Sequence, residues 1–254
     1  MSELTKATAG AVAKPTVRDL VQRQEAAIKA QLAGALNSEA FVRAAVSEIS
    51  ASPQLQQADP KSVLGAVMLA AKLKLEIGAG LGHFYLTPRK VRGEWQCVPI
   101  IGYQGFIELA FRSGRIERIE SFLVREGDVF EVGGSSERGT FFDWQPQDND
   151  ETRPWTHAVA VAKIVGGGSV WRFLTKQQVL ARRPAYWDKG PWSSHEEEMA
   201  QKTVIRYLAT RVPKSSELAT AVEKSRQVEE EGRVVVKRDG IQDLDVVTVQ
   251  EETE

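Results

Sequence analysis

The sequence predicts a mixed α+β fold built from helices and antiparallel strands. Apolar residues recur with the 3.6-residue period of a helix through most of residues 17–78. Short apolar segments separated by turn residues, the pattern of β-hairpins, then occupy much of residues 83–174. A helical pattern returns inside this region at residues 102–113 and again at 195–212. Helices followed by hairpin-forming strands favour an α+β arrangement over alternating β-α-β units.

Three helices are expected before the first strand. Residues 1–15 precede them, are rich in Ala, Thr and Gly, and are expected to form a disordered arm. The second helix follows Ser38 as its N-cap, and the third opens with Asp59-Pro60 and is expected to stop at Gly78. The apolar stripes of the three helices are Val17, Leu20, Val21, Ile28 and Leu32; Phe41, Val42, Ala45, Val46 and Ile49; and Val63, Leu64, Val67, Met68 and Ala71.

A hairpin and a fourth helix are expected next. His83–Pro88 and Glu94–Ile101 are short apolar segments on either side of a turn at Lys90–Gly93. Gly102–Ser113 has helical periodicity, and Gly114 is placed to end that helix as a left-handed cap. Its apolar positions are Tyr103, Phe106, Ile107, Ala110 and Phe111.

The rest of the core is expected to hold more strands and one further helix. The triple glycine at 166–168 is a flexible hairpin turn between the last two strands, and the helix at His195–Val212 ends before Pro213. Residues 16–215 therefore form the expected core, and 216–254 an acidic, aromatic-free tail that is mobile or binds a partner. The expected strands are Arg115–Glu126, Thr140–Trp144, Thr156–Val165 and Ser169–Leu174.

The formal net charge of −1 conceals an uneven distribution of charge. The balance is +3 over residues 61–130 and +6 over 163–214, but −4 over 131–162 and −6 over 215–254. A basic body with an acidic tail suits an anionic partner such as nucleic acid. No apolar run approaches the roughly 18–20 residues of a membrane span. The single cysteine, Cys97, fits a reducing compartment, so we expect a cytoplasmic protein that makes no contact with a membrane.

The motifs argue against an enzyme. The glycine-rich run Gly78–Gly82 follows a helix and lacks a Gly-Lys-Ser/Thr element, so we interpret it as a turn and not as a phosphate-binding loop. The three histidines, His83, His157 and His195, are far apart and show no metal-ligand spacing. The run 196–198 of three glutamates is better explained as a solvated helix start than as a metal site. We expect no catalytic residue and no metal ligand.

Two helices carry cations that could contact phosphate. In the helix at 102–113, Glu108 and Arg112 are spaced i, i+4, which indicates either a surface ion pair or an edge from which Arg112 and Arg115 reach DNA. In the helix at 195–212, Lys202 and Arg206 share a face. Glu198 is spaced to pair with Lys202, whereas Arg206 has no acidic residue three or four positions away. Arg211 and Lys214 lie near the end of the same helix.

A segment between the last strand and that helix combines cations with aromatic rings. Single-stranded nucleic acids stack bases on such rings and contact such cations, at about 1–3 kcal/mol per stacked base. The alternative is a loop that its tryptophans anchor to the core. The candidate cations are Lys176, Arg182, Arg183 and Lys189, and the rings are Tyr186, Trp187 and Trp192.

Two landmarks resemble the RecT family of phage single-strand annealing proteins. The first is the run Ile101-Gly102-Tyr103-Gln104-Gly105-Phe106-Ile107-Glu108-Leu109-Ala110-Phe111-Arg112-Ser113-Gly114, together with the stretch before it from His83. The second is the segment with Trp192, Glu197-Glu198-Met199, Lys202-Thr203-Val204-Ile205-Arg206 and Pro213-Lys214-Ser215. The resemblance covers about residues 17–215. Phe106 stands where leucine is commoner in the family, and the turn at Gly78–Gly82 differs from the usual one.

The resemblance implies ATP-independent binding and annealing of single-stranded DNA within rings or helical filaments. It implies a curved antiparallel sheet backed by helices, similar to annealing proteins of the Rad52 type. It implicates Tyr103, Arg112, Arg115, Lys202 and Arg206 in DNA binding. The implied partners are a phage exonuclease and the single-strand binding protein of a bacterial host, with no cofactor beyond Mg²⁺ as a modulator. The alternative function is a passive single-stranded DNA-binding protein that does not anneal.

Assembly is expected because one domain of about 200 residues spans only about 35–40 Å and touches few nucleotides. A heterologous interface between copies would extend the groove into a ring or an open helix. The helices of residues 17–50 are candidates for that interface, since their stripes are apolar and their charge is nearly balanced. The alternative is that these helices simply cover the sheet.

Overall fold

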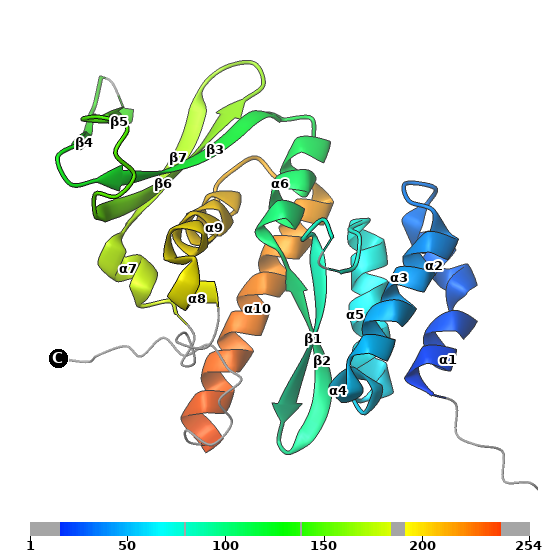
Figure 1. The fold of residues 1–254 in the computed structure, drawn as a ribbon. Helices are drawn as coiled ribbons and strands as arrows, with labels where there is room; N and C mark the ends of the chain where they lie inside the picture. The colour runs from blue at the N-terminus through cyan, green and yellow to red at the C-terminus, as the bar shows by residue number, and fades with distance from the viewer. Residues whose placement is uncertain (1–15, 79, 138, 184–190, 240–254) are drawn as a thin grey trace, which may run out of the picture.

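The structure, a computed structural model, describes residues 16–78, 80–137, 139–183 and 191–239. The described chain combines helices with antiparallel strands, which confirms the predicted α+β class. Figure 1 shows the helices α1 to α5 at one side of the molecule and a three-stranded sheet at the other, with α6 and α10 between them. The predicted N-terminal arm lies outside the described residues.

The first five helices pack their apolar stripes against one another. The stripe predicted for residues 17–32 is divided between two helices that meet at Gln24, and the third predicted helix ends at Leu73 instead of Gly78 because Lys74 adopts a left-handed conformation with φ of 54°. Val21, Ile28 and Leu32 are fully buried. These stripes therefore cover the core of their own chain and are not available to a neighbour. The helices are α1 (Val17–Arg23), α2 (Glu25–Leu32), α3 (Ser38–Ala51), α4 (Pro53–Gln56) and α5 (Pro60–Leu73).

The first two strands form the predicted hairpin, β1 (Phe84–Val91) and β2 (Glu94–Ile101). Arg92 and Gly93 both have positive φ, as a two-residue type I′ turn requires. One face packs on α5, where the Cys97 amide donates a hydrogen bond to Ser62 Oγ at 2.9 Å. Burial raises the pKa of the Cys97 thiol to about 12, so this cysteine stays protonated and unreactive.

The three-stranded antiparallel sheet has the order β3-β6-β7, and α9 (Glu196–Ala209) covers one of its faces. On the central strand, Ala158, Ala160 and Ala162 are fully buried, and such small side chains let a helix approach closely. The predicted glycine turn at 166–168 joins β6 to β7, with all three residues at positive φ. The strands are β3 (Ile116–Arg125), β6 (Trp155–Ile164) and β7 (Ser169–Thr175), and two short helices follow, α7 (Lys176–Leu180) and α8 (Pro191–Ser194).

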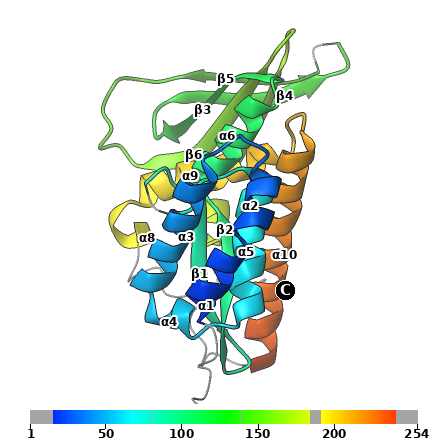
Figure 2. The same ribbon diagram turned by 90° about the vertical axis from the view of Figure 1, so that its right-hand side faces the viewer.

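A second hairpin, β4 (Val129–Ser135) and β5 (Gly139–Gln145), folds over the other face of the sheet. Its rings pack on rings of the sheet: Trp144 stacks on Phe122 at 4.0 Å between centroids, and Phe130 lies 5.8 Å from Phe173. The sequence did not predict β4, because the adjacent glycines at 133–134 interrupt the alternation of a strand. Figure 2 shows this hairpin together with the sheet at one end of the molecule.

The two helices between the N-terminal helices and the three-stranded sheet are α6 (Tyr103–Arg112) and α10 (Ser216–Asp239). In α6, Leu109 is buried and Phe111 is 42% exposed, which differs from the predicted stripe. The apolar face of α6 turns toward α9, with Phe106 and Ala110 on one side of the contact and Ile205 and Leu208 on the other.

The helix α10 differs from the prediction of a tail, mobile or partner-binding, that begins at residue 216. Leu218 and Ala221 are fully buried in the main core, where α10 packs against α5, α6 and β2. Residues 216–239 carry six acidic and five basic side chains, so most of the negative charge that suggested a tail belongs to residues 240–254. Residues 240–254 lie outside the described chain.

We predict that Leu218→Ala lowers the free energy of unfolding by about 2–5 kcal/mol, because it leaves a cavity at a fully buried position. Chemical denaturation of the full chain measures this loss. Ala219→Ser, on the exposed side of the same helix turn, is the matched control and should change stability by less than about 0.5 kcal/mol. A variant L218A as stable as the parent would mean that α10 is not part of the cooperative core.

We predict that acid weakens the fold through His157. Its ring lies 5.1 Å from the Phe130 ring and 5.9 Å from the Phe173 ring, and burial lowers its pKa below the ordinary 6.5. Well above pH 6.5 the imidazole is neutral in both the folded and the unfolded chain, so its protonation does not change the free energy of unfolding. Below it the unfolded chain takes up the proton first, so stability falls until the folded pKa is reached. Denaturation midpoints between pH 7.5 and 5 should fall less steeply in His157→Phe, and equal slopes would contradict the prediction.

Candidate nucleic-acid interface

The start of α6 is pressed against the start of β1. A Cβ atom at Gly102 would lie 2.0 Å from the carbonyl oxygen of Gly82, and one at Gly105 would lie 2.4 Å from that of His83. The Gly102 amide donates a hydrogen bond to His83 O at 2.9 Å. Only glycine permits this approach of two backbones. Packing thus explains the Gly-Tyr-Gln-Gly run of the first landmark. The same contact fixes the backbone position of Tyr103.

Two tyrosines lie at this junction. Tyr85 on β1 is 37% exposed, and its ring lies close to Gly102 and Gly82. Tyr103 is half-buried, and its hydroxyl accepts a hydrogen bond from Gln104 Nε2 at 2.7 Å. The sequence reasoning missed Tyr85. The alternation of β1, in which Phe84 and Leu86 are buried, would have placed it on the outer face.

The second landmark meets the first at this point. Lys202 on α9 places its Nζ 5.5 Å from the centroid of the Tyr103 ring, a cation–π contact. Arg206 lies one turn further along α9 and is also half-buried. We call Tyr85, Tyr103, Lys202 and Arg206 the α6–α9 site. The structure thereby brings together three residues that the sequence analysis had assigned to DNA from separate parts of the chain.

An ion pair holds the first turn of α9 on the sheet. The guanidinium of Arg125 donates two hydrogen bonds to the Glu197 carboxylate, at 2.9 and 2.7 Å, and the Arg125 side chain is only 12% exposed. These hydrogen bonds raise the pKa of Arg125 above its ordinary value. A bidentate pair fixes direction as well as distance. Arg125 therefore orients the helix that carries Lys202 and Arg206.

Glu196 makes a second attachment of the same turn. Its carboxylate accepts hydrogen bonds from Trp155 Nε1 at 3.2 Å and from Arg183 at 2.7 Å, and it lies 3.6 Å from Lys176 Nζ. The prediction that the glutamate run is merely solvated is therefore wrong for Glu196 and Glu197, while Glu198 is exposed. Lys176 and Arg183 have an acidic partner inside the chain, and their role in DNA binding stays a prediction.

The aromatic segment before α9 is partly structural. The Trp192 ring is 6% exposed and lies under the Arg183 guanidinium, 5.9 Å away, so it presents no free face for a base. This outcome corresponds to the alternative in which the tryptophan anchors the segment. Arg182 donates a hydrogen bond to the Tyr207 hydroxyl at 2.6 Å and stacks over that ring. Residues 184–190, including Lys189, Tyr186 and Trp187, lie outside the described residues.

Arg112 is a structural residue. Its guanidinium donates hydrogen bonds to the carbonyl oxygens of Leu73 at 2.9 Å and Lys74 at 3.2 Å, at the C-terminal end of α5, and its Nε lies 3.9 Å from Glu108. A cation at this end of a helix also interacts favourably with the helix dipole. Arg112 therefore joins α6 to α5, as a structural role would require, and its role in DNA binding stays a prediction.

Three further predicted cations lie beyond the C-terminal ends of α6 and α9. Arg115 and Arg211 are exposed and Lys214 is half-exposed. No side-chain hydrogen bond or ion pair joins any of them to a described residue. Their assignment to DNA is not tested by the fold.

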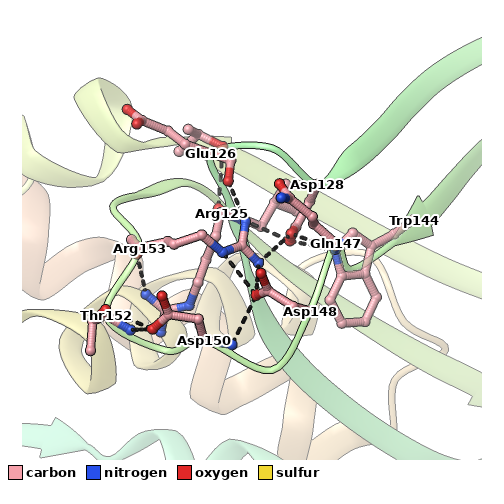
Figure 3. Close-up of polar contacts among 11 residues, drawn as sticks. Arg125, Glu126, Asp128, Trp144, Gln147, Asp148, Asp150, Thr152 and Arg153 are labelled. Carbon is pink, nitrogen blue, oxygen red and sulfur yellow. Dashed lines mark hydrogen bonds and ion pairs between the residues drawn. The ribbon is translucent and has the colours of Figure 1, made fainter.

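A polar network anchors the base of the β4–β5 hairpin (Figure 3). Asp128 has a 2% exposed side chain and accepts hydrogen bonds from the amides of Arg125 and Gln147 and from Arg153 at 2.9 Å. Burial by itself would raise the pKa of Asp128, but these hydrogen bonds outweigh it and hold the pKa well below its ordinary value. In the loop after β5, Asp148 binds the same Arg153 at 2.9 Å and Asp150 accepts hydrogen bonds from Thr152, so both carboxylates have partners within the chain.

The remaining candidate motifs have structural explanations. Gly78 donates its amide to Phe84 O at 2.9 Å and has φ of 112°, so the glycine-rich run begins a turn into β1 as predicted. Within the described ranges no group of three or more His, Cys, Asp or Glu side chains is placed to hold a metal ion. In the same part of the chain, no helix combines the length and apolarity needed to cross a bilayer.

Tyrosines beside a lysine, with exposed arginines at the ends of the same helices, are residue types that contact bases and phosphates in the class of nucleic-acid-binding proteins. The RecT family model matches residues 39–236. The chain belongs to the RecT family.

Two relatives illustrate the extent of the similarity. The chain is 37% identical over 205 residues to "Protein RecT" of Escherichia coli strain K12, a match that covers 77% of this chain and 75% of that protein. It is 27% identical over 173 residues to "Uncharacterized protein YqaK" of Bacillus subtilis strain 168, covering 67% of this chain and 58% of the other. The family match includes most of α10, which agrees with its place in the core.

We predict that Arg112→Ala lowers the free energy of unfolding by about 1–3 kcal/mol, because two carbonyl oxygens lose a charged donor. The salt dependence of DNA binding should not change, since both terminal nitrogens of Arg112 are already engaged by carbonyl oxygens. Chemical denaturation measures the loss of stability, and DNA binding at several salt concentrations with the same preparation measures the salt slope. Arg43→Ala removes an exposed i, i+4 pair with Glu39 and should cost less than about 0.5 kcal/mol. A reduced salt slope in R112A would restore the DNA assignment.

Proposed function

We propose that the chain binds single-stranded DNA at the α6–α9 site and anneals it to a complementary strand without ATP. Membership in the RecT family supports single-strand annealing in recombination as the general activity. The observation that carries the local assignment is the contact of Lys202 with Tyr103, since it joins both landmark segments in one place. A ring beside a cation matches the two parts of a nucleotide, the base and the phosphate.

The chemistry of annealing follows from neutralised phosphates. Two complementary strands repel each other, and cations that neutralise their phosphates lower that barrier. Contact through the backbone leaves the pairing edges of the bases free to test a second strand. Lys202 and Arg206 supply charge, and the exposed Tyr85 ring supplies a surface on which a base can stack. No covalent step is required of the protein.

The rest of the proposed setting rests on the family resemblance alone. We infer a phage or prophage origin, with a phage exonuclease that supplies the single strand and the single-strand binding protein of a bacterial host as partners. We infer a cytoplasmic site of action and a multimeric active form. Mg²⁺ enters only as a modulator of DNA binding.

An annealing assay tests the activity. Two complementary oligonucleotides are mixed with the protein in EDTA and without nucleotide, and duplex formation is followed by fluorescence. Acceleration over the protein-free rate is the expected result. Binding without acceleration would support the passive binding protein instead, and cleavage that appears on adding Mg²⁺ would indicate a nuclease.

We predict that Lys202→Glu combined with Arg206→Glu weakens binding to a single-stranded oligonucleotide. The salt slope should fall by about 0.7 for each phosphate that the protein no longer neutralises. Fluorescence anisotropy at several salt concentrations measures both the affinity and the slope.

The matched control is Lys29→Glu combined with Arg43→Glu, which makes the same change of charge on the exposed side of α2 and α3. It should bind nearly as the parent does. Circular dichroism confirms that both variants are folded. If the two pairs weaken binding equally, the effect is one of net charge and the α6–α9 site is wrong.

A further inference from the structure

The exposed apolar side chains of the described chain lie at three places. Leu81 and Tyr85 adjoin the α6–α9 site, and Phe111 and Val165 lie near the C-terminal end of α6. The third place is the β4–β5 hairpin, with Val129 at 53% and Val132 at 44% exposure. Because most of the stripe residues of α1 to α3 are buried inside the chain, these three places offer the most exposed large apolar side chains for a contact between two copies.

The outer face of the β4–β5 hairpin carries an unusual charge arrangement. Glu131 and Asp143 are directly opposite each other in the antiparallel register, and both are exposed. Neither carboxylate has a hydrogen-bond or ion-pair partner among the described residues. Like charges in opposite positions of a strand pair destabilise it. With Val129 and Phe141, which alternate onto the same face, they form what we call the hairpin patch.

A complementary surface lies at the C-terminal ends of α6 and α9. The Val165 amide donates to Arg115 O at 2.9 Å, and the Gly114 amide donates to Phe111 O at 2.9 Å. Ala110 and Val212 line the same small apolar cavity, which places the end of α9 beside the end of α6. We call the four residues Phe111, Arg115, Val165 and Arg211 the corner patch.

The corner patch is cationic because nearby carboxylates are already engaged. Glu117 pairs with Lys163 at 2.9 Å and Glu120 with Arg118 at 3.3 Å, which leaves Arg115 and Arg211 uncompensated within the described chain. Val165 is 56% exposed, and the three glycines after it have open space where a Cβ would be. The patch thus offers two positive charges beside an exposed ring and an exposed aliphatic side chain.

We propose that the hairpin patch of one copy docks on the corner patch of a second copy of this chain. Each patch combines two charges with apolar side chains, and the signs of the charges are opposite. The apolar side chains are an exposed Val129 and a half-buried Phe141 in the hairpin patch, and an exposed Phe111 and Val165 in the corner patch. The two patches are built from different residues, so the contact is heterologous and each copy keeps one patch of each kind for further neighbours. Such a contact propagates into a ring or an open helix. Single-stranded DNA is a poor occupant of the hairpin patch, since carboxylates repel phosphate.

Sedimentation velocity without DNA tests the contact separately from annealing. The parent protein should associate as its concentration rises and dissociate as salt is raised, because the contact pairs opposite charges. The variant E131K/D143K and the variant R115E/R211E should each associate at least roughly tenfold more weakly, since each brings like charges together. An equimolar mixture of the two variants should associate again, because both kinds of contact then pair opposite charges.

The matched controls change the same number of charges on the helices α1 to α3. They are E25K/E39K and R18E/R43E, all at exposed positions. They should associate as the parent does. A parent that stays monomeric at every concentration and salt would overturn the proposal, as would variants that associate normally or a mixture that fails to recover. If R115E/R211E associates normally but loses salt-dependent binding to an oligonucleotide, the corner patch belongs to DNA instead.

Discussion

The attachment of the first turn of α9 is the constraint on which the candidate interface depends. Arg125, whose side chain is only 12% exposed, forms a bidentate pair with Glu197, and Glu196 binds Trp155 and Arg183. Removing one partner of such a pair would leave a charge without compensation, which is far more costly than losing an exposed ion pair. The pair fixes the direction of α9, and the small side chains of β6 fix its distance from the sheet. Together they determine where Lys202 meets Tyr103.

The glycines at the start of α6 impose a second constraint, which sets the position of Tyr103. Gly102 and Gly105 allow the helix to touch the chain at Gly82 and His83, so Tyr103 starts from a position set by backbone contact. A motif that resembles a family signature thus has a steric cause as well as a functional one. A side chain at either glycine would push α6 away from β1 and separate Tyr103 from Tyr85.

The sequence predicted the fold class and most elements because their signals are local. The turn at Arg92-Gly93, the helix after Gly102 and the glycine turn at 166–168 each depend on a few adjacent residues. The roles of Arg112, Glu196 and Glu197 could not be inferred from the sequence, because their partners lie 13 to 72 residues away. The same reason explains why the sequence indicates a tail where the structure has α10. The net charge of residues 215–254 is visible in the sequence, whereas the pocket that receives Leu218 is formed by three distant elements.

The rings beneath the β4–β5 hairpin have a consequence for motion. Phe122, Phe130, Phe142 and Trp144 pack together, yet none of them belongs to the main core formed by the helices and the inner face of the sheet. A unit with its own small cluster can open while the remainder stays folded, at a free energy below that of global unfolding. Amide hydrogens of β4 and β5 would then exchange with solvent earlier than those of β6, whose strand is paired on both sides. A bound neighbour would therefore stabilise the β4–β5 hairpin more than it stabilises the rest of the described chain.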